Sequence, residues 1–334
     1  MDSLTQIVLG AAVGEATLGK KVGNKALLYG AIAGTIPDLD VLAHHVTDTI
    51  TATELHRGFS HSIVFCVLMA PILGWTVNRL ERSHNLGWYP WASLFFWGLF
   101  THPLLDAFTT WGTQLFWPFD IRLAFNSIFV IDPFYTLPFL CCVITVLFLK
   151  RASNRRKVVN RFGLIWSTTY LVLTLIVKEL INHRFANALE TQGIEFVQFS
   201  SRPAPLSIFL WNVNVDTETD YLIGDYSVFD TEPILFKSYA KNREDSAVLE
   251  HNTNVQRLIQ IAEGWYILEE RNGGWYFNDL RFGLIPSKNA SPYFAFSYRL
   301  IEENGVLLAE ERQKTSRDAR FLLQKLWQRI KGNR

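Results

Sequence analysis

The sequence has few cysteines, almost no net charge and no glycine-rich nucleotide-binding motif, and each absence argues against a class of structure or function. Its three cysteines lie inside apolar stretches without Cys-x-x-Cys spacing, so we expect no disulfide framework. A net charge of +1 and the lack of a recognisable binding module predict no nucleic-acid partner. The missing phosphate loop excludes the P-loop and dinucleotide-binding classes.

Formal charge is also missing from long apolar stretches in the first half of the chain. Residues 62–78, 91–105 and 162–177 carry none, and residues 128–149 carry only Asp132. Stretches of this length cross, or nearly cross, about 30 Å of hydrocarbon at about 1.5 Å per residue. The alternative is a soluble protein with unusually apolar core helices. Residues 128–149 argue against it because they have no polar face.

Two shorter apolar stretches precede these four, at residues 3–18 and 25–39. Both contain small residues at small-xxx-small spacing, which lets helix backbones approach closely inside a bundle. We therefore predict a polytopic α-helical membrane domain of about six helices over residues 1–183.

Basic residues predict the orientation of these six spans. Lysines and arginines concentrate between spans one and two, three and four, and five and six, so these loops should be cytoplasmic. The opposite loops, residues 41–60 and 109–127, contain only Arg57 and Arg122 as basic residues. Both termini are then expected outside the cytoplasm.

The same topology brings a set of histidines and aspartates to the outer ends of separate spans. His102 and Asp106, at i and i+4, share one helical face, and Asp38 and Asp40 follow Pro37, where a regular helix is interrupted. Mixed imidazole and carboxylate ligation favours zinc, with manganese or iron as alternatives, and so many groups can hold one or more ions. The predicted metal ligands are Asp38, Asp40, His56, His61, His102 and Asp106, and the secondary candidates are Gln6, Asp132, Glu179 and His183.

Four motifs in order, MDSLTQIVLG, GTIPDLD, HRGFSHS and HPLLD, resemble those of a membrane-bound metal-dependent hydrolase family that includes YdjM-, YbcI- and YfhP-like proteins. The resemblance implies a bacterial inner-membrane location and puts Asp2 and the six predicted ligands on the family's metal and catalytic positions. Gln6 departs from the family's frequent histidine and is a poor transition-metal ligand. The HPLLD motif also resembles that of zinc phospholipase C and P1 nuclease enzymes.

The second half of the chain predicts a different, soluble structure. Alternating apolar residues flank Asn272-Gly273 and Asn304-Gly305, which are strong hairpin signals. We expect a small, mainly β domain at residues 184–312 outside the cytoplasm. A basic amphipathic helix is expected within residues 313–334, either packed on that domain or lying on a membrane surface.

These features predict a metal-dependent hydrolase of a phosphoester, or a related ester, in a lipid or lipid-linked envelope molecule. Bound metal lowers the pKa of water, and a carboxylate, Asp2 or Asp38, would accept its proton. Arg57 is expected to hold a phosphate. The alternative is a non-catalytic metal-binding membrane protein, either a carrier or a structural protein that binds a partner.

Overall fold

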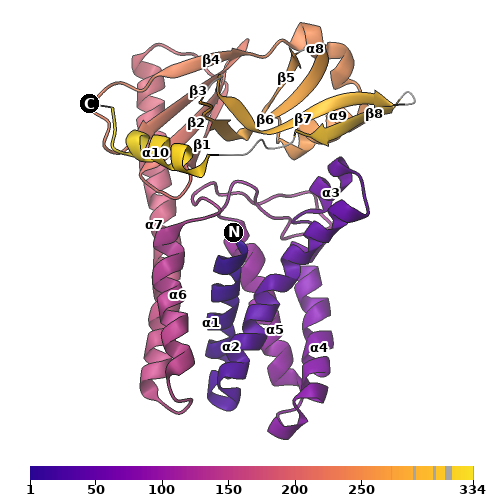
Figure 1. The fold of residues 1–334 in the computed structure, drawn as a ribbon, viewed down its shortest axis with the longest axis vertical. Helices are drawn as coiled ribbons and strands as arrows, with labels where there is room; N and C mark the ends of the chain where they lie inside the picture. The colour runs from indigo at the N-terminus through magenta and orange to yellow at the C-terminus, as the bar shows by residue number, and fades with distance from the viewer. Residues whose placement is uncertain (272, 289–290, 304–305, 313–317, 334) are drawn as a thin grey trace. The chain divides into compact units, whose positions relative to one another are not determined.

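The computed structural model describes residues 1–271, 273–288, 291–303, 306–312 and 318–333, and the chain divides into two compact units (Figure 1). The first unit contains Met1–Ala43, Leu55–Val177 and Pro205–Ser207. The second contains His44–Glu54, Lys178–Ala204 and Ile208–Arg334. The chain therefore passes between the units several times, and residues 44–54 do not belong with their sequence neighbours.

The first unit is helical. Its main helices range from 12 residues in α2 to 38 in α7, and short 3₁₀ segments connect some of them. The elements are α1 (Ser3–Val22), α2 (Asn24–Thr35), η1 (Ile36–His45), η2 (Phe59–His61), α4 (Ile63–Leu80), η3 (Arg82–His84), α5 (Trp88–Asp106), α6 (Pro133–Phe148) and α7 (Asn154–Thr191).

Three segments in the described part of the chain are long and apolar enough to cross a membrane: Asn24–His45, Ile63–Leu80 and Asn154–Thr191. The helix α6 is apolar but has only 16 residues. Many large apolar side chains on these helices are exposed, as expected of surfaces that face lipid rather than water. A helical membrane region is thus supported, with three candidate spans.

Glycines allow α1 and α2 to pack with their backbones in contact. A Cβ atom on Gly14 would lie 2.1 Å from the carbonyl oxygen of Ala26, and one on Gly10 would lie 2.3 Å from that of Gly30. Neither distance is possible for a larger residue. The small-residue spacing predicted such close approach, and these contacts confirm it.

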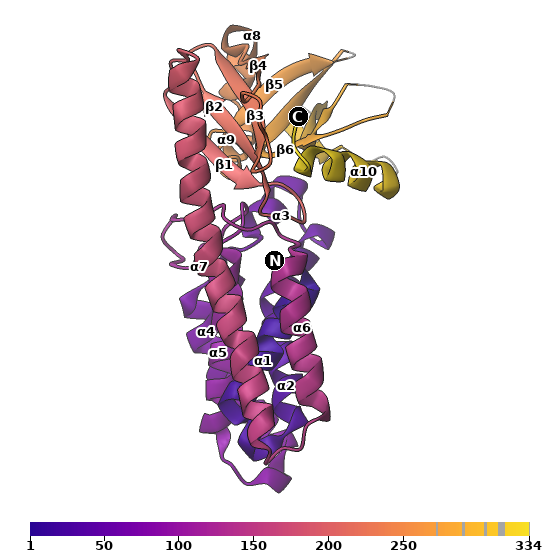
Figure 2. The ribbon, with the colours of Figure 1, turned by 90° about the vertical axis from the view of Figure 1, so that its left-hand side faces the viewer.

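The helix α7 is longer than the sequence indicated, and Figure 2 shows it as one continuous helix. Residues 154–161, predicted as part of a basic loop, are helical. Two of these residues make hydrogen bonds to α1. Arg156 donates to both carboxylate oxygens of Glu15, at 2.7 and 2.6 Å, and Asn160 donates to the carbonyl oxygen of Ala12 at 2.9 Å. Residue 183, the predicted end of the membrane domain, lies within this helix.

The second unit is mainly β, as predicted. It contains two antiparallel four-stranded sheets, ordered β1-β2-β3-β4 and β5-β6-β7-β8. Strands of the first sheet are β1 (Gln198–Pro203), β2 (Leu210–Asp216), β3 (Asp220–Ser227) and β4 (Phe236–Ala240). Those of the second are β5 (Tyr266–Arg271), β6 (Gly274–Ile285), β7 (Tyr293–Glu303) and β8 (Val306–Glu311).

Both predicted hairpins form, β5 with β6 and β7 with β8, although Asn272 and residues 304–305 of their turns lie outside the described residues. The unit also contains α3 (Thr49–Leu55), most of which belongs to it, α8 (Arg243–Glu250), α9 (Thr253–Ile261) and α10 (Ala319–Ile330). The end of α10 is held by ion pairs from Arg329 to Asp225 and Asp230. Residues 313–317 of the predicted terminal helix are not among those described.

Candidate metal centre

Four side chains from three separate segments of the first unit bring their ligand atoms together. One atom each from Asp38, His61, His102 and Asp106 lies within 4.8 Å of the other three. Pro37 has no backbone N–H with which to continue the hydrogen bonds of α2. The helix α2 gives way at Ile36 to the 3₁₀ segment that carries Asp38. His61 ends η2, and His102 and Asp106 lie one turn apart on α5.

The distances among these atoms are those of ligands around one small cation. The two Nε2 atoms of His61 and His102 are 3.1 Å apart. Asp38 Oδ1 lies 3.4 and 3.3 Å from them, and Asp106 Oδ2 lies 3.3 and 3.5 Å from them. Atoms about 2.0–2.1 Å from one tetrahedral ion lie about 3.3 Å from each other. The four side chains could therefore hold one metal ion.

The four side chains differ in exposure. Those of His61, His102 and Asp106 are 0% exposed, whereas that of Asp38 is 24% exposed. Asp38 is thus the member of the group that solvent reaches.

Hydrogen bonds to the far side of each imidazole turn Nε2 toward the centre. His102 Nδ1 lies 2.6 Å from the carbonyl oxygen of Gly34, so Nδ1 carries the proton and Nε2 keeps its lone pair. His61 Nδ1 lies 2.9 Å from Ser60 Oγ and 3.3 Å from Asp40 Oδ2. Such outer partners fix the tautomer and orientation of metal-binding histidines.

Asp40 and His56, predicted as ligands, lie beside the group of four rather than in it. The carboxylate of Asp40 contacts His56 Nδ1 at 2.9 Å, and it accepts hydrogen bonds from the backbone N–H of Arg57 and from Ser60 Oγ, both at 2.9 Å. Arg57 has a φ of 61°, a conformation that costs on the order of 1–3 kcal/mol outside glycine. The surrounding contacts hold this strained turn in place, with its N–H bound to Asp40.

Positive and polar groups surround Asp106. Arg57 Nε makes an ion pair with Oδ2 at 3.2 Å, and the amino group of Met1 pairs with Oδ1. Gln6 Nε2 also donates to Oδ1, at 3.0 Å. By contrast, Oδ2 is buried and accepts no hydrogen bond with good geometry. Since a buried carboxylate oxygen normally has such partners, this oxygen fits the role of a metal ligand.

Burial and neighbouring carboxylates shift the pKa values of His61 and His56 in opposite directions. Burial alone would lower the pKa of His61, but Asp106, Asp38 and Asp40 outweigh it and raise the pKa to about 9. For His56 burial dominates, and its pKa is lowered although Asp40 opposes the shift. The three carboxylates thus favour positive charge at His61.

The remaining sequence candidates lie outside the group of four. Asp2 caps α1 and Asp132 caps α6, each accepting hydrogen bonds from backbone N–H groups. Glu179 and His183 are exposed on the part of α7 that belongs to the second unit, and they pair with each other at 3.8 Å. Gln6 is buried against Asp106, in an outer position where an amide is a suitable donor.

Sequence reasoning missed three groups that orient the site: the carbonyl of Gly34, the hydroxyl of Ser60 and the hydroxyl of Thr109, which accepts from Arg57 Nη1 at 2.9 Å. Ser60 stands between the two histidines of HRGFSHS, and Thr109 follows Asp106 by three residues. Both positions were therefore visible as hydroxyls next to predicted ligands. A backbone carbonyl gives no such signal.

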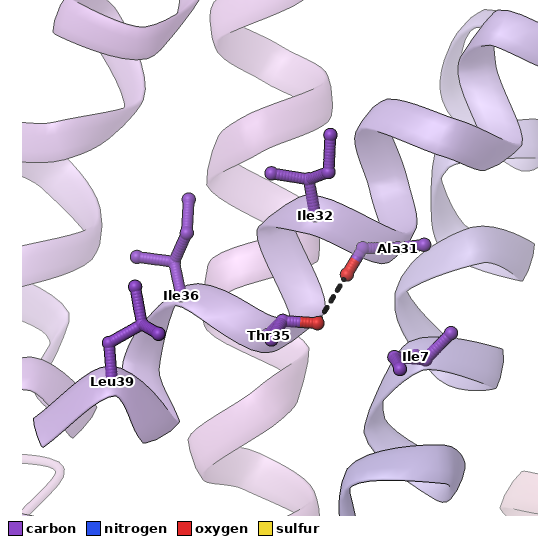
Figure 3. A pocket seen from close by; sticks show the side chains of 6 residues that line it. All are labelled: Ile7, Ala31, Ile32, Thr35, Ile36 and Leu39. Carbon is purple, nitrogen blue, oxygen red and sulfur yellow. Dashed lines mark hydrogen bonds between the residues drawn. The ribbon is translucent and has the colours of Figure 1, made fainter. Parts of the chain in front are cut away.

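An open apolar groove of about 340 Å³ lies between α1 and the end of α2 (Figure 3). Ile7 contributes one wall, and the other comes from Ala31, Ile32, Thr35, Ile36 and Leu39. The hydroxyl of Thr35 is bonded to the carbonyl of Ala31, which leaves the lining apolar. Leu39 directly follows Asp38, so the groove and the metal group share η1.

Comparison with known proteins supports the resemblance seen in the motifs. A family model described as YdjM inner membrane protein matches residues 1–181. Inner membrane protein YbcI of Escherichia coli (strain K12) is 31% identical over 131 residues, which cover 36% of this chain and 74% of that protein. No solved structure matches the chain. Together with the candidate spans, both descriptions support a location in the inner membrane.

Proposed function

The chain belongs to the YdjM inner membrane protein family, and we propose that it is a metal-dependent hydrolase of that membrane. Its substrate would be a phosphoester, or a related ester, in a lipid or lipid-linked envelope molecule. The observation that carries this proposal is that ligand atoms of Asp38, His61, His102 and Asp106 all lie within 4.8 Å of one another, with three of these side chains closed to solvent and one partly open.

Zinc suits the two imidazoles and two carboxylates best, and manganese or iron are the alternatives. His61, His102 and Asp106 would be its permanent ligands. When bound, such an ion polarises an ester and lowers the pKa of a water molecule toward about 7.

The proton of that water would pass to Asp38. Its carboxylate is the most exposed of the four side chains and lies within 3.4 Å of the two imidazole nitrogens that would hold the ion. Asp2 is the weaker candidate because its carboxylate is engaged in capping α1 through Thr5. Asp38 would thus act as a base in one step and as a fourth ligand in the resting site.

Arg57 has a different proposed role from the one expected from sequence. Its guanidinium is buried and already contacts Asp106, Thr109 and the carbonyl oxygen of Gly112. We assign it the neutralisation of Asp106, which keeps that carboxylate ionised and aimed at the ion, rather than the binding of a phosphate.

The groove beside η1 supports an amphiphilic substrate. Five of its six lining residues belong to the candidate span Asn24–His45, so lipid would surround it, and Leu39 follows Asp38 in sequence. Its volume of about 340 Å³ is within the ordinary range of ligand pockets. An acyl chain lying there would leave its ester near the metal group.

The proposed topology has six spans with both termini and the β unit outside the cytoplasm. It is supported by the basic residues at one end of the helices, among them Lys25 and Arg151, and by the charge rule that assigns such ends to the cytoplasm. The metal group lies at the other end of the same helices, where α1 and α4 begin and α5 ends. The site would therefore face the outer leaflet.

A second candidate is a non-catalytic metal site. Structural zinc sites use four protein ligands with no open position, and Asp38 completes such a set. A carrier is less suited, because it needs free polar groups within the membrane and the carboxylate inside α1, Glu15, is paired with Arg156.

Metal analysis of the purified chain tests both candidates. Wild type should retain about one zinc, and His102→Ala should lose it because His102 belongs to the group. The control His183→Ala should keep its zinc, since His183 is exposed and lies outside the group. Hydrolysis of bis(4-nitrophenyl) phosphate and of a lipid phosphodiester in vesicles would then be compared. Metal without hydrolysis of any ester favours the structural role, and absence of metal from wild type refutes both.

A further inference from the structure

The connection between α5 and α6, inside the first unit, has an apolar tip. Residues 107–131 contain only one acidic and one basic side chain. We call residues 116–121 the aromatic tip, and its large apolar side chains are exposed: Phe119 by 68%, Ile121 by 52%, Phe116 by 45% and Trp117 by 38%. Soluble monomeric proteins rarely expose so large an apolar patch unless it contacts a partner or a membrane. The tip is therefore an interaction surface.

Backbone hydrogen bonds fix this loop on the first unit. Thr113 and Leu123 exchange two of them, at 3.0 and 2.9 Å. At the start of α4, the N–H of Ile63 donates to the carbonyl oxygen of Leu115 at 3.0 Å. The hydroxyl of Thr113 also donates to the carbonyl oxygen of His61, at 3.3 Å. The tip consequently has a defined position relative to α4 and to the turn that carries His61.

Aromatic rings join the tip to the surface of α4. The ring centroids of Trp117 and Phe59 are 4.9 Å apart, and those of Phe59 and Phe65 are 5.4 Å apart. Phe65 belongs to the candidate span Ile63–Leu80, whose exposed apolar side chains include Val67, at 53%. The apolar surface of the tip is thus continuous with a helix face that meets lipid.

The backbone of the tip is also suited to leaving water. The N–H groups of Trp117, Phe119 and Ile121 donate to carbonyl oxygens within residues 114–119, at 3.0, 3.1 and 2.8 Å. Pro118 has no N–H to satisfy. Backbone donors without a partner are costly in hydrocarbon, because no water is present there. These internal bonds remove that cost for three of the donors that insertion would bring out of water.

We propose that the aromatic tip inserts into the lipid leaflet that surrounds the first turn of α4, at the boundary between headgroups and acyl chains. Aromatic side chains favour this depth, and interfacial amphipathic helices bury their apolar face there by about 5–10 Å. Two polar side chains lie beside the tip for contact with headgroups: Asp120 accepts from Gln114 Nε2 at 3.3 Å, and Arg122 donates to the carbonyl oxygen of Trp111 at 3.2 Å. The bond from Thr113 would then hold the His61 turn near headgroup depth. This inference does not depend on metal binding or hydrolysis.

The test uses the full chain in vesicles of phosphatidylethanolamine and phosphatidylglycerol, with the three native cysteines replaced by alanine. A nitroxide label is attached to Phe119→Cys or to Phe116→Cys. Its collisions with oxygen, which concentrates in lipid, are compared with its collisions with a water-soluble nickel chelate. The matched controls are Val67→Cys on the exposed face of α4 and Ser83→Cys in the exposed turn η3. Both tip labels should give an oxygen-to-nickel ratio similar to that at Val67 and well above that at Ser83.

A charge placed in the tip provides a second arm. With the label at Phe116→Cys, adding Phe119→Glu should lower the ratio toward that at Ser83, because a carboxylate is costly in the membrane. The conservative change Phe119→Leu should leave the ratio unchanged. In the chain with its cysteines intact, lipids brominated on their acyl chains should quench a larger share of the tryptophan emission than in Trp117→Phe.

Two outcomes would overturn the proposal. Tip labels that meet the nickel chelate as often as the label at Ser83 show that the tip lies in water. Tip labels that are shielded from both reagents show that protein covers the tip, either the second unit or another copy of the chain. Each result refutes insertion and leaves the proposed metal function standing, since neither reports on the metal group.

Discussion

Replacing Gly30 by alanine should disrupt the metal centre from a distance, through the packing of α1 against α2. A Cβ atom at this position would lie 2.2 Å from the carbonyl oxygen of Gly10 and 2.8 Å from the Cα atom of Gly14. A carbon–oxygen contact needs about 3.3 Å, so the two helices must separate by about 1 Å. Overpacking of this kind costs about 1–3 kcal/mol.

That separation is large compared with what a metal site tolerates. The helix α2 supplies the Gly34 carbonyl that binds His102 Nδ1 at 2.6 Å, and Asp38 follows four residues later. Ligand distances must hold to about 0.2 Å for tight binding. We therefore expect Gly30→Ala to lose zinc, or to bind it at least tenfold more weakly, while it remains helical.

The assay is zinc content and Zn²⁺ affinity of the purified variant, together with its helical circular dichroism and thermal unfolding in detergent. Gly163→Ala serves as the control, because a Cβ there would meet only side chains, of Cys142 and Phe139, at 3.0 Å or more. It should keep its zinc. A folded Gly30→Ala variant with wild-type affinity would refute the argument that helix spacing sets the site.

Four further results are expected. Asp40→Asn should weaken Zn²⁺ binding about 10–100-fold by releasing the His61 ring, and an unchanged affinity would remove Asp40 from the site. Because the pKa of His61 is raised from 6.5 to about 9 in the metal-free fold, the stabilisation from its protonated form is complete below pH 6.5 and is lost as the pH rises through 9. Thermal unfolding from pH 6 to above pH 9 should show this loss without metal. Arg156→Met should cost about 3–5 kcal/mol, since it leaves Glu15 buried and unpaired, and unfolding in detergent measures it. If the chain hydrolyses lipid phosphodiesters, Leu39→Asn should raise KM for the lipid and leave the rate with a soluble phosphodiester unchanged.

The candidate site was predictable from sequence to the extent that local spacing decides it. The i, i+4 relation fixes His102 and Asp106 on one helical face, and the topology brings Asp38 and His61 to the same ends of their helices. Choosing between Asp38 and Asp40 was not possible from spacing. That choice depends on the turn at Arg57, whose positive φ points its N–H at Asp40 and thereby occupies that carboxylate.

The fold was predictable where the hydrophobic pattern is strong, and less so where polar residues find distant partners. The apolar stretches and the two hairpins all correspond to helices and strands. The beginning of α7 looked like a loop because Arg156 and Asn160 are polar, and only their partners on α1 explain the helix. Ile50 stands in a short polar segment, and nothing local indicates that it packs into a core more than 200 residues away in sequence.

The same small residues determine both the packing of the first unit and the position of its metal ligands. Gly34 has no side chain, so the backbone of α2 lies against α1 and a Cβ there would meet the Gln6 carbonyl oxygen at 2.4 Å. Gln6 in turn donates to Asp106, while the Gly34 carbonyl accepts from His102. One helix contact therefore orients two ligands on α5. Since any larger residue would push both away, the spacing of small residues in the first two helices is a requirement of the site as much as of the bundle.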